Sequence, residues 1–387
     1  MATQTLADLG AEVIKVERPG SGDDTRGWGP PFLKDGDGRE TKDSTYFASC
    51  NRGKKSLTVD LSKPEGQSIV RRLGRLSDVV VENYKAGDLA RYGLDFATLH
   101  ALNPRLVYCS ITGYGQTGPY SARAGYDPIA QAMGGLMSVT GERDGLPGAG
   151  PQRVGVAVTD LMTSVYAVSG ILAALWSRER TGEGQHIDLA LLDVQVSSMI
   201  NVAQAYLSAG IVAQRSGNVH PSVVPSQVFE CADGKLMLAA GNDGQFAKLC
   251  EAIGRAELAR DPRFATNEGR VRNRELVTST VQQALQRGNV AYWTDLLAKA
   301  GVPCGPINNI AAVFEDPHLR HRGVRIEVEH PLVGALPLVA NPLHLSGTPV
   351  EYGLPPPLVG QHTDELLGQL LGLDAGAIEV LRRTGAI

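Results

Sequence analysis

The stretch PQRVGVAVTDLMTSVYAVSGILAALW, residues 151–176, carries a single acidic side chain, Asp160, among mostly apolar or small neighbours. Residues 161–176 repeat apolar side chains at helical spacing, which predicts a helix with an apolar stripe formed by Leu161, Val165, Val168, Leu172 and Leu175. Asp160 precedes this helix and so is expected to cap it. A carboxylate held in apolar surroundings is also a candidate nucleophile or acid–base group. This window alone leaves both interpretations open.

Upstream of this helix, strands and helices alternate. Short apolar, β-branched runs at 13–17, 78–82 and 105–111 are typical of buried parallel strands. Between the first two, Ser62 and Glu65 have the spacing of a capping box, with Pro64 in the first turn. Downstream, a strand at 186–190 and a helix at 191–208 continue the alternation. We therefore expect a Rossmann-like α/β layer structure.

The chain is long enough for more than one domain. We expect a large domain over 1–200, a linker over 201–226 and a small α+β domain over 227–315. The small domain should open with a hairpin that turns at Asp233-Gly234. We expect a return segment over 316–387, whose C-terminal helices join the large domain. The sequence opens inside an amphipathic helix that no strand precedes. We expect the first strand to be missing and the large domain to be N-terminally truncated.

Composition excludes several classes of protein. A net charge of −4 gives no basic field for nucleic acid or for an anionic membrane, and no apolar run reaches the length of a membrane span. The five cysteines are widely spaced without a C-x-x-C pair, which argues against a disulfide framework or a zinc site. His318 and His321 lie one helical turn apart without a further ligand nearby, so we expect no metal site.

Two motifs suggest ligand binding. GYGQTG, residues 113–118, matches the glycine pattern of a dinucleotide site, but Pro119 and a loop-like stretch follow where a helix should begin, so we interpret it as a loop. Cations recur at the carboxyl ends of expected strands, where open α/β sheets bind ligands, namely Arg18, Arg52, Lys54, Lys55 and Arg91. Such a pattern suits a phosphorylated carrier molecule.

Nine separated motifs, in order, resemble one family. They include VIKVERPGSGDDTRGWGPPF, NRGKKSLTVDLSKPEG, VVVENYKAGDLARYGLD, GYDPIAQAMGGLMSVTG, TGEGQHIDLALLD and GVPCGPINNIAAVFEDPHL. Together they resemble the class III coenzyme A transferases across essentially the whole chain. The resemblance implies an interlocked homodimer, acyl-CoA and a carboxylate as substrates, no permanently bound cofactor, and a cytoplasmic location, or a mitochondrial one if a targeting segment was lost.

The resemblance also assigns residues. Asp160 matches the catalytic nucleophile, and the positions that match contacts to CoA are Arg18, Val59, Asn83, Tyr84 and Arg91. Arg123 stands near a lysine that some members use for CoA. The sequence GNVHPSVVPSQ replaces the glycine run of formyl-CoA transferases, which favours succinyl-CoA and a dicarboxylate such as glutarate or hydroxymethylglutarate. Arg26 and Arg153 are candidates for binding the second carboxylate of the acceptor.

The implied chemistry is nucleophilic. Asp160 is expected to be ionised at neutral pH, because the N–H groups of its helix favour the charged form. It would form a mixed anhydride and then an aspartyl-CoA thioester. Two alternatives remain: an α-methylacyl-CoA racemase, which needs a histidine base where this chain has Tyr126, and an inactive, truncated protein that only binds CoA.

Overall fold

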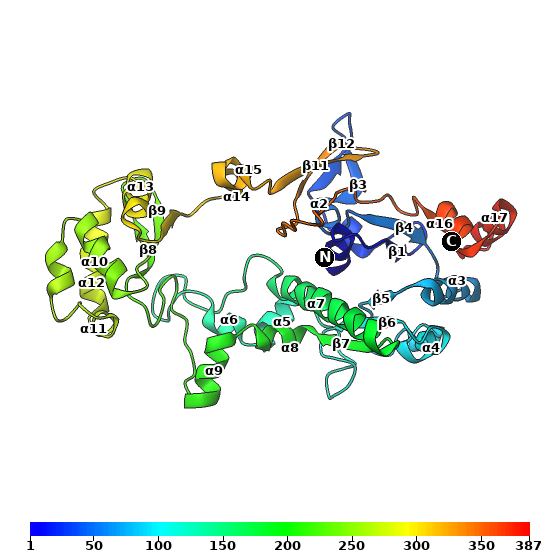
Figure 1. The fold of residues 1–387 in the computed structure, drawn as a ribbon, viewed down its shortest axis with the longest axis horizontal. Helices are drawn as coiled ribbons and strands as arrows, with labels where there is room; N and C mark the ends of the chain where they lie inside the picture. Colours follow the sequence, from blue (N-terminus) through cyan, green and yellow to red (C-terminus); the bar gives the residue numbers. More distant parts are fainter. The chain divides into compact units, whose positions relative to one another are not determined.

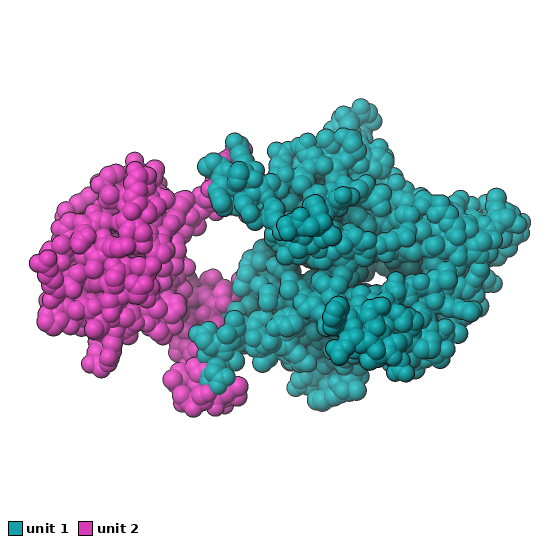
Figure 2. All heavy atoms as spheres, in the orientation of Figure 1, with its two compact units in different colours: residues 1–136, 154–204, 317–387 teal, residues 137–153, 205–316 magenta.

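The computed structural model describes residues 1–387 and divides into two compact units. The first comprises residues 1–136, 154–204 and 317–387, and the second comprises residues 137–153 and 205–316 (Figure 2). Two of the four divisions fall within helix α6 (Leu136–Val139) and helix α9 (Ile200–Ala209), and the other two fall after Arg153 and after Asp316. The domain limits expected from the sequence are drawn differently and stay a prediction.

Two parallel sheets organise the first unit (Figure 1). Strand β1 (Val13–Glu17) pairs with β4 (Lys54–Thr58), and the other sheet has the order β5 (Val79–Glu82), β6 (Val107–Thr112) and β7 (His186–Ala190). The apolar, β-branched runs thus form strands where the sequence predicts them, within two residues at each end. The structure is a mixed α/β fold with several small sheets.

Helices flank these strands, and the start of one differs from expectation. They are α1 (Ala2–Asp8), α3 (Pro64–Leu76), α4 (Phe96–Leu102), α5 (Asp127–Met133), α7 (Val158–Thr181) and α8 (Leu191–Ser197). Helix α3 begins at Pro64 without a side-chain cap, and the Ser62 hydroxyl donates instead to the Asp60 carboxylate at 2.7 Å. The predicted capping box is therefore wrong, because Asp60 engages Ser62 in a local turn before the helix begins.

The remaining elements of the first unit come from both ends of the chain. Antiparallel pairs join β2 (Phe32–Lys34) to β3 (Glu40–Ser44) and β11 (Arg325–His330) to β12 (Gly334–Val339). Helix α2 (Thr45–Cys50) follows β3, and α15 (Pro317–His321) precedes β11. The last helices, α16 (Thr363–Leu371) and α17 (Ala375–Arg383), share a core with β4 and α3 through Leu57, Ile69, Leu366 and Ile378.

The second unit is a small α+β body. Strands β8 (Ser226–Glu230), β9 (Lys235–Ala239) and β10 (Cys304–Pro306) form an antiparallel sheet, and the predicted hairpin at Asp233-Gly234 is confirmed. Its helices are α10 (Asp243–Ala252), α11 (Asn267–Arg272), α12 (Arg274–Leu285), α13 (Val290–Ala300) and α14 (Ile310–Glu315). Residues 201–209, expected in a linker, are helical, because α9 continues from Ile200.

Helix α7 is longer than the sequence predicts. It runs over 24 residues and has a mean hydropathy of 1.5 in its most apolar window, which is enough to cross a membrane by length and composition alone. The expectation that no apolar run reaches this length is therefore wrong. Core helices of soluble proteins meet the same criterion, so the finding is weak evidence for a membrane span.

The glycine-rich segment after β6 is a loop, as predicted. No helix forms between Thr112 and α5, which begins at Asp127. The ends of the loop touch: a Cβ on Gly113 would lie 2.5 Å from the Cα of Gly125. Only glycine at these positions allows the two backbones to approach so closely. The loop over 113–125 is therefore closed at its base, directly before α5.

Candidate active site

Asp160 lies in the first turn of α7 but does not cap it. The helix begins at Val158, so Asp160 is its third residue, and the cap position is held by Ala157, whose side chain accepts no hydrogen bond. The Asp160 side chain is solvent accessible and its carboxylate makes no hydrogen bond within the chain. The prediction that Asp160 is the helix cap is therefore wrong, because the helix starts a turn earlier than its apolar stripe suggests.

The acceptor for this helix start comes from another helix. Asp127, the first residue of α5, accepts hydrogen bonds through Oδ2 from the backbone N–H of Thr159 at 2.8 Å and of Asp160 at 3.2 Å. Its other oxygen accepts from the Gln131 amide at 2.6 Å. Asp127 is only 5 % exposed. Sequence reasoning missed this residue, although the absence of a capping side chain at Ala157 signals that the helix needs an acceptor from elsewhere.

The surroundings of Asp160 favour its protonated form. Partial burial, the larger effect, and repulsion from Asp127 raise the pKa of Asp160 to about 6, against an opposing effect of the Met1 amino group. The side chain is accessible at its surface yet surrounded by protein at longer range, so solvent screening moderates this shift. The expectation that the helix N–H groups dominate is not met, because Asp127 already accepts from those groups. Asp160 is nevertheless mostly ionised above pH 7.

Helix α2 contributes one aromatic side chain, that of Tyr46, near this position. Burial and then the charge of Asp160 raise the pKa of Tyr46, so the phenol lies within electrostatic range of the carboxylate. The ring of Trp28 meets that of Tyr46 edge to face, with centroids 5.1 Å apart. Both rings are solvent exposed. Sequence reasoning did not select Tyr46, because no spacing in the sequence links α2 to α7.

Four residues expected to contact CoA stand at carboxyl ends of parallel strands. Arg18 directly follows β1, Val59 directly follows β4, and Asn83 and Tyr84 are the first two residues after β5. Burial raises the pKa of Tyr84, and the positive charge of Arg18 opposes this effect. Arg18 is exposed and forms an ion pair with Asp24. The structure thus brings Arg18 and Tyr84 into electrostatic range of each other.

The residues expected to contact CoA also differ in accessibility. Val59 is 1 % exposed and packs into the core with Ile69, and its backbone N–H donates to the Glu17 carbonyl at 2.8 Å, so only its backbone carbonyl is available to a ligand. Arg91 is exposed, with its guanidinium over the Tyr92 ring at 4.7 Å. The guanidinium of Arg123 lies 3.8 Å from the centroid of the Tyr120 ring. None of these residues makes a hydrogen bond or an ion pair with Asp160.

The two arginines expected to bind the acceptor have contrasting environments. Arg26 is buried and donates to both oxygens of Glu17 at 2.8 and 2.9 Å, to Asp43 at 2.8 Å and to the Pro357 carbonyl at 3.0 Å. These contacts compete with any substrate for its guanidinium. Arg153 is exposed and belongs to the second unit.

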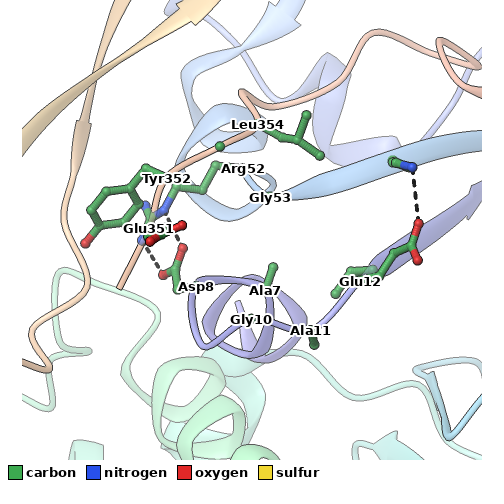
Figure 3. Close-up of a pocket in the computed structure, with 13 residues that line it drawn as sticks. Ala7, Asp8, Gly10, Ala11, Glu12, Arg52, Gly53, Glu351, Tyr352 and Leu354 are labelled. Atoms are coloured by element: carbon green, nitrogen blue, oxygen red, sulfur yellow. Dashed lines mark hydrogen bonds and ion pairs between the residues drawn. The ribbon is translucent and has the colours of Figure 1, made fainter. Parts of the chain in front are cut away.

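A cavity of about 320 Å³ lies elsewhere in the first unit, between the end of α1 and residues 351–354 (Figure 3). Both of its cations are engaged: Arg52 pairs with Asp8 at 2.6 Å, and Lys55 pairs with Glu12 at 3.1 Å. The cavity is at the amino ends of β1 and β4, whereas Arg18 follows the carboxyl end of β1. Arg52 and Lys55 line this cavity. The expectation that Arg52, Lys54 and Lys55 stand at the carboxyl end of a strand is therefore wrong, because β4 begins at Lys54.

Comparisons with known proteins identify the family. Residues 1–363 match the model of CoA-transferase family III. The chain is 48 % identical over 369 residues to a succinate–glutarate CoA-transferase of Agrobacterium fabrum, a match that covers 95 % of this chain and 91 % of the relative. It is 45 % identical over 386 residues to the succinyl-CoA:glutarate CoA-transferase of Mus musculus, covering all of this chain and 86 % of the relative.

The fold agrees with this assignment. A crystal structure of a CaiB/BaiF family protein from Brucella suis superimposes with a TM-score of 0.83 at 46 % sequence identity, covering 95 % of this chain and 94 % of that one. Sequence and fold thus agree over nearly the whole length of the chain. The chain belongs to CoA-transferase family III and is a CoA-transferase, an enzyme whose substrates are CoA thioesters.

Proposed function

We propose that this enzyme moves CoA from succinyl-CoA to a dicarboxylate of five or six carbons, such as glutarate or hydroxymethylglutarate, through covalent intermediates on Asp160. The printed activities of the relatives from A. fabrum and M. musculus support the succinyl and glutarate parts of this proposal. The observation that carries the mechanism is a single accessible carboxylate, free of hydrogen bonds, at the start of α7.

The chemistry follows from the two states of this carboxylate. An Asp160 oxygen attacks the thioester carbonyl of the donor, the C–S bond breaks, and CoA leaves as a thiolate, which gives a mixed anhydride. The thiolate then attacks the Asp160 carbonyl, the donor leaves as its carboxylate, and an aspartyl-CoA thioester remains. The acceptor carboxylate attacks this thioester and releases the thiolate. Attack of the thiolate on the acceptor carbonyl of the second anhydride completes the transfer and restores Asp160.

The electrostatic environment suits this role. A carboxylate whose pKa is raised to about 6 is still largely ionised at pH 7.5, yet it is more basic than an ordinary aspartate. Nucleophilic reactivity rises with basicity within one class of nucleophile, so the raised pKa favours attack on the thioester. The role of Asp160 as nucleophile is therefore compatible with its partly buried position.

For CoA we propose a site at the carboxyl ends of the parallel strands of a Rossmann-like large domain. Arg18, Asn83 and Tyr84 follow β1 and β5 there. Val59, directly after β4, would contribute through its backbone, and Arg91 would contribute an exposed positive charge. Arginine side chains and loop N–H groups at strand ends are well suited to phosphates.

For the acceptor, Arg153 is the more accessible of the two arginines. A bidentate guanidinium can hold the carboxylate that does not react, and the Arg153 side chain is exposed. Arg26 would have to give up contacts to Glu17 and Asp43 before it could bind a substrate. We therefore propose Arg153 first and retain Arg26 as the competing candidate.

We also propose a homodimer located in the cytoplasm. Helix α7 exposes a row of large apolar side chains, namely Leu161, Val165, Leu172 and Trp176, and the last of these is 72 % exposed. Exposed apolar surfaces of this kind mark protein interfaces. A partner that covers this face would also reduce the water near Asp160 and so protect an anhydride from hydrolysis.

Oxygen-18 in the carboxylates of glutarate tests the mechanism. The oxygen that bridges the second anhydride stays on Asp160 when the thiolate attacks the acceptor carbonyl, so the peptide containing Asp160 gains label during turnover with succinyl-CoA. Mass spectrometry of the digested enzyme measures this gain. Direct transfer between substrates would leave Asp160 unlabelled, and that outcome would refute the covalent mechanism.

A matched control separates Asp160 from other carboxylates at helix starts. Asp193 is the third residue of α8, as Asp160 is of α7, and it is likewise exposed. The peptide containing Asp193 should remain unlabelled in the same digest. Label in both peptides would indicate non-specific exchange. An acceptor screen with succinyl-CoA should rank glutarate and hydroxymethylglutarate far above oxalate, and the reverse order would refute the substrate assignment.

A further inference from the structure

Asp127 connects three segments around Asp160. Its Oδ2 holds the backbone N–H groups of Thr159 and Asp160, and its Oδ1 accepts from Gln131. Gln131 is fully buried and accepts in turn from the backbone N–H of Val154 at 2.9 Å. The first turn of α7 is thus fixed from α5 on both sides of its start, and the backbone of Asp160 is fixed with it.

Capping alone does not require a charge at this position. Six other α-helices are capped by a side chain at their own N-cap, namely Ser44 of α2, Asn242 of α10, Thr266 of α11, Asn289 of α13, Asn309 of α14 and Asp374 of α17. Five of these are neutral, and three of them are amides, which cap helices as well as a carboxylate does. At a buried position a neutral amide would also avoid the desolvation cost of an anion. The charge of Asp127 therefore calls for a further explanation.

No cation compensates this charge. All three hydrogen bonds to Asp127 come from amide N–H groups, and Asp127 forms no ion pair. Its field extends to two neighbouring groups, because Asp127 contributes to the raised pKa of Asp160 on α7 and of Tyr46 on α2. The Met1 amino group on α1 acts on Asp160 in the opposite direction, and its own pKa is lowered, mainly by burial, to about 6.

We propose that Asp127 is a positioning residue that fixes Asp160 for attack and, through its uncompensated negative charge, favours conversion of the Asp160 carboxylate to a neutral acyl derivative. This inference rests on the proposed role of Asp160 as nucleophile. Repulsion between Asp127 and Asp160 acts while Asp160 is a carboxylate. It disappears in the anhydride and in the thioester, because the acylated side chain carries no charge. Repulsion thus raises the free energy of the resting state relative to both intermediates.

Asp127→Asn tests the charge while it retains most of the shape. Asparagine keeps one oxygen for the N–H groups of α7 and loses both the charge and the bond from Gln131. We expect the carboxyl carbon of Asp160, followed by carbon-13 NMR, to titrate at lower pH than in the wild type, by about one unit. Asp160→Asn identifies this resonance by its absence. We also expect kcat to fall about tenfold and the acidic limb of the rate profile to move to lower pH.

Gln131→Met is the matched structural control. It removes the same hydrogen bond to Asp127 and lowers the melting temperature, but it leaves the charge in place. The Asp160 midpoint should therefore not fall in this variant. If Asp127→Asn and Gln131→Met lower the melting temperature alike while neither moves the Asp160 midpoint, Asp127 is only a structural cap and the inference is refuted.

The titration distinguishes the inference from the proposed function. If the Asp160 peptide gains no label and Asp160→Asn stays active, the proposed mechanism fails, whereas the NMR midpoint still reports the effect of Asp127 on Asp160. If Asp160→Asn is inactive but Asp127→Asn leaves midpoint and kcat unchanged, only the inference fails. The inference is supported if Asp127→Asn lowers both the titration midpoint of Asp160 and kcat, and if Gln131→Met leaves that midpoint unchanged.

Discussion

Two buried carboxylates of the first unit, Glu17 and Asp127, are each 5 % exposed but are stabilised differently. Glu17 accepts two hydrogen bonds from the Arg26 guanidinium and one from the Ser56 hydroxyl at 2.7 Å, and these partners lower its pKa against the effect of burial. Asp127 accepts only from amides. The charge of Glu17 is therefore cancelled locally and serves the fold, whereas the charge of Asp127 acts on its neighbours.

The largest effect is expected for Asp160, the carboxylate on which the charge of Asp127 acts. Asp160→Asn removes the nucleophile, and Asp160 does not cap α7, so the fold should be preserved. We expect kcat to fall by about 10⁴-fold or more, equivalent to more than about 5 kcal/mol. Steady-state kinetics and circular dichroism measure the two properties. Near wild-type turnover would remove Asp160 from the mechanism and leave the Asp127 charge without a function.

The next effect concerns the paired carboxylate. Arg26→Ala leaves Glu17 buried without its cation, which should reduce the free energy of unfolding by about 3–5 kcal/mol in urea denaturation. Arg39→Ala is the control, because Arg39 forms an exposed pair with Asp37 at 2.8 Å and should contribute at most about 0.5 kcal/mol. A stable Arg26→Ala variant that only raises the KM for dicarboxylates would instead favour Arg26 as the acceptor site.

The pH dependence of stability should differ in sign between Glu17 and Asp160. The pKa of Glu17 is lowered on folding, so its stabilising contribution is present above its unfolded pKa and is lost as the pH falls through the folded value. The pKa of Asp160 is raised to about 6, so its ionised form destabilises the fold above pH 6, and this effect disappears below pH 4. The Asp160→Asn variant should therefore have a higher melting temperature than the wild type at pH 7.5. This difference in melting temperature should vanish by pH 4. An equal difference at both pH values would contradict the raised pKa.

The smallest effect is expected where a carboxylate caps its own helix in solvent. Asp374 accepts from the backbone N–H of Ala377 at 2.8 Å at the start of α17, and asparagine caps nearly as well as aspartate. Asp374→Asn should change the free energy of unfolding by less than about 0.5 kcal/mol and leave the rate profile unchanged. A shift of the acidic limb in this variant would show that the limb does not report on Asp160.

The sequence predicts local elements well and long-range partners poorly. Strands β1 and β7 form at the expected residues, because β-branched runs are a local property of the sequence. The acceptor at the start of α7 could not be predicted, because Asp127 lies 33 residues before Asp160 in the chain. Helix α7 itself is longer than its apolar stripe, since Asp127 satisfies N–H groups that precede the stripe.

The residues of the candidate site also differ in whether the sequence could predict them. Asp160 and the residues at the strand ends were predicted from motifs. The effects of Tyr46 and Asp127 depend on how the fold positions α2, α5 and α7, which the sequence alone does not predict. Arg26 shows the converse: its sequence context suggests a ligand, but its donors are engaged by Glu17, Asp43 and a backbone carbonyl. Whether a guanidinium is available depends on tertiary contacts, which residue type does not reveal.

The close contact between Gly113 and Gly125 couples the position of the loop between them to the position of Asp160. Gly125 is two residues before Asp127, and a Cβ on Gly113 would lie 2.5 Å from the Cα of Gly125. Any side chain at either glycine would push the two backbones apart and displace the start of α5. Since Asp127 holds the backbone of Asp160, that displacement would be transmitted to the carboxylate. A methyl group added at either glycine would therefore displace the Asp160 carboxylate and slow the reaction, although it would not contact the substrate.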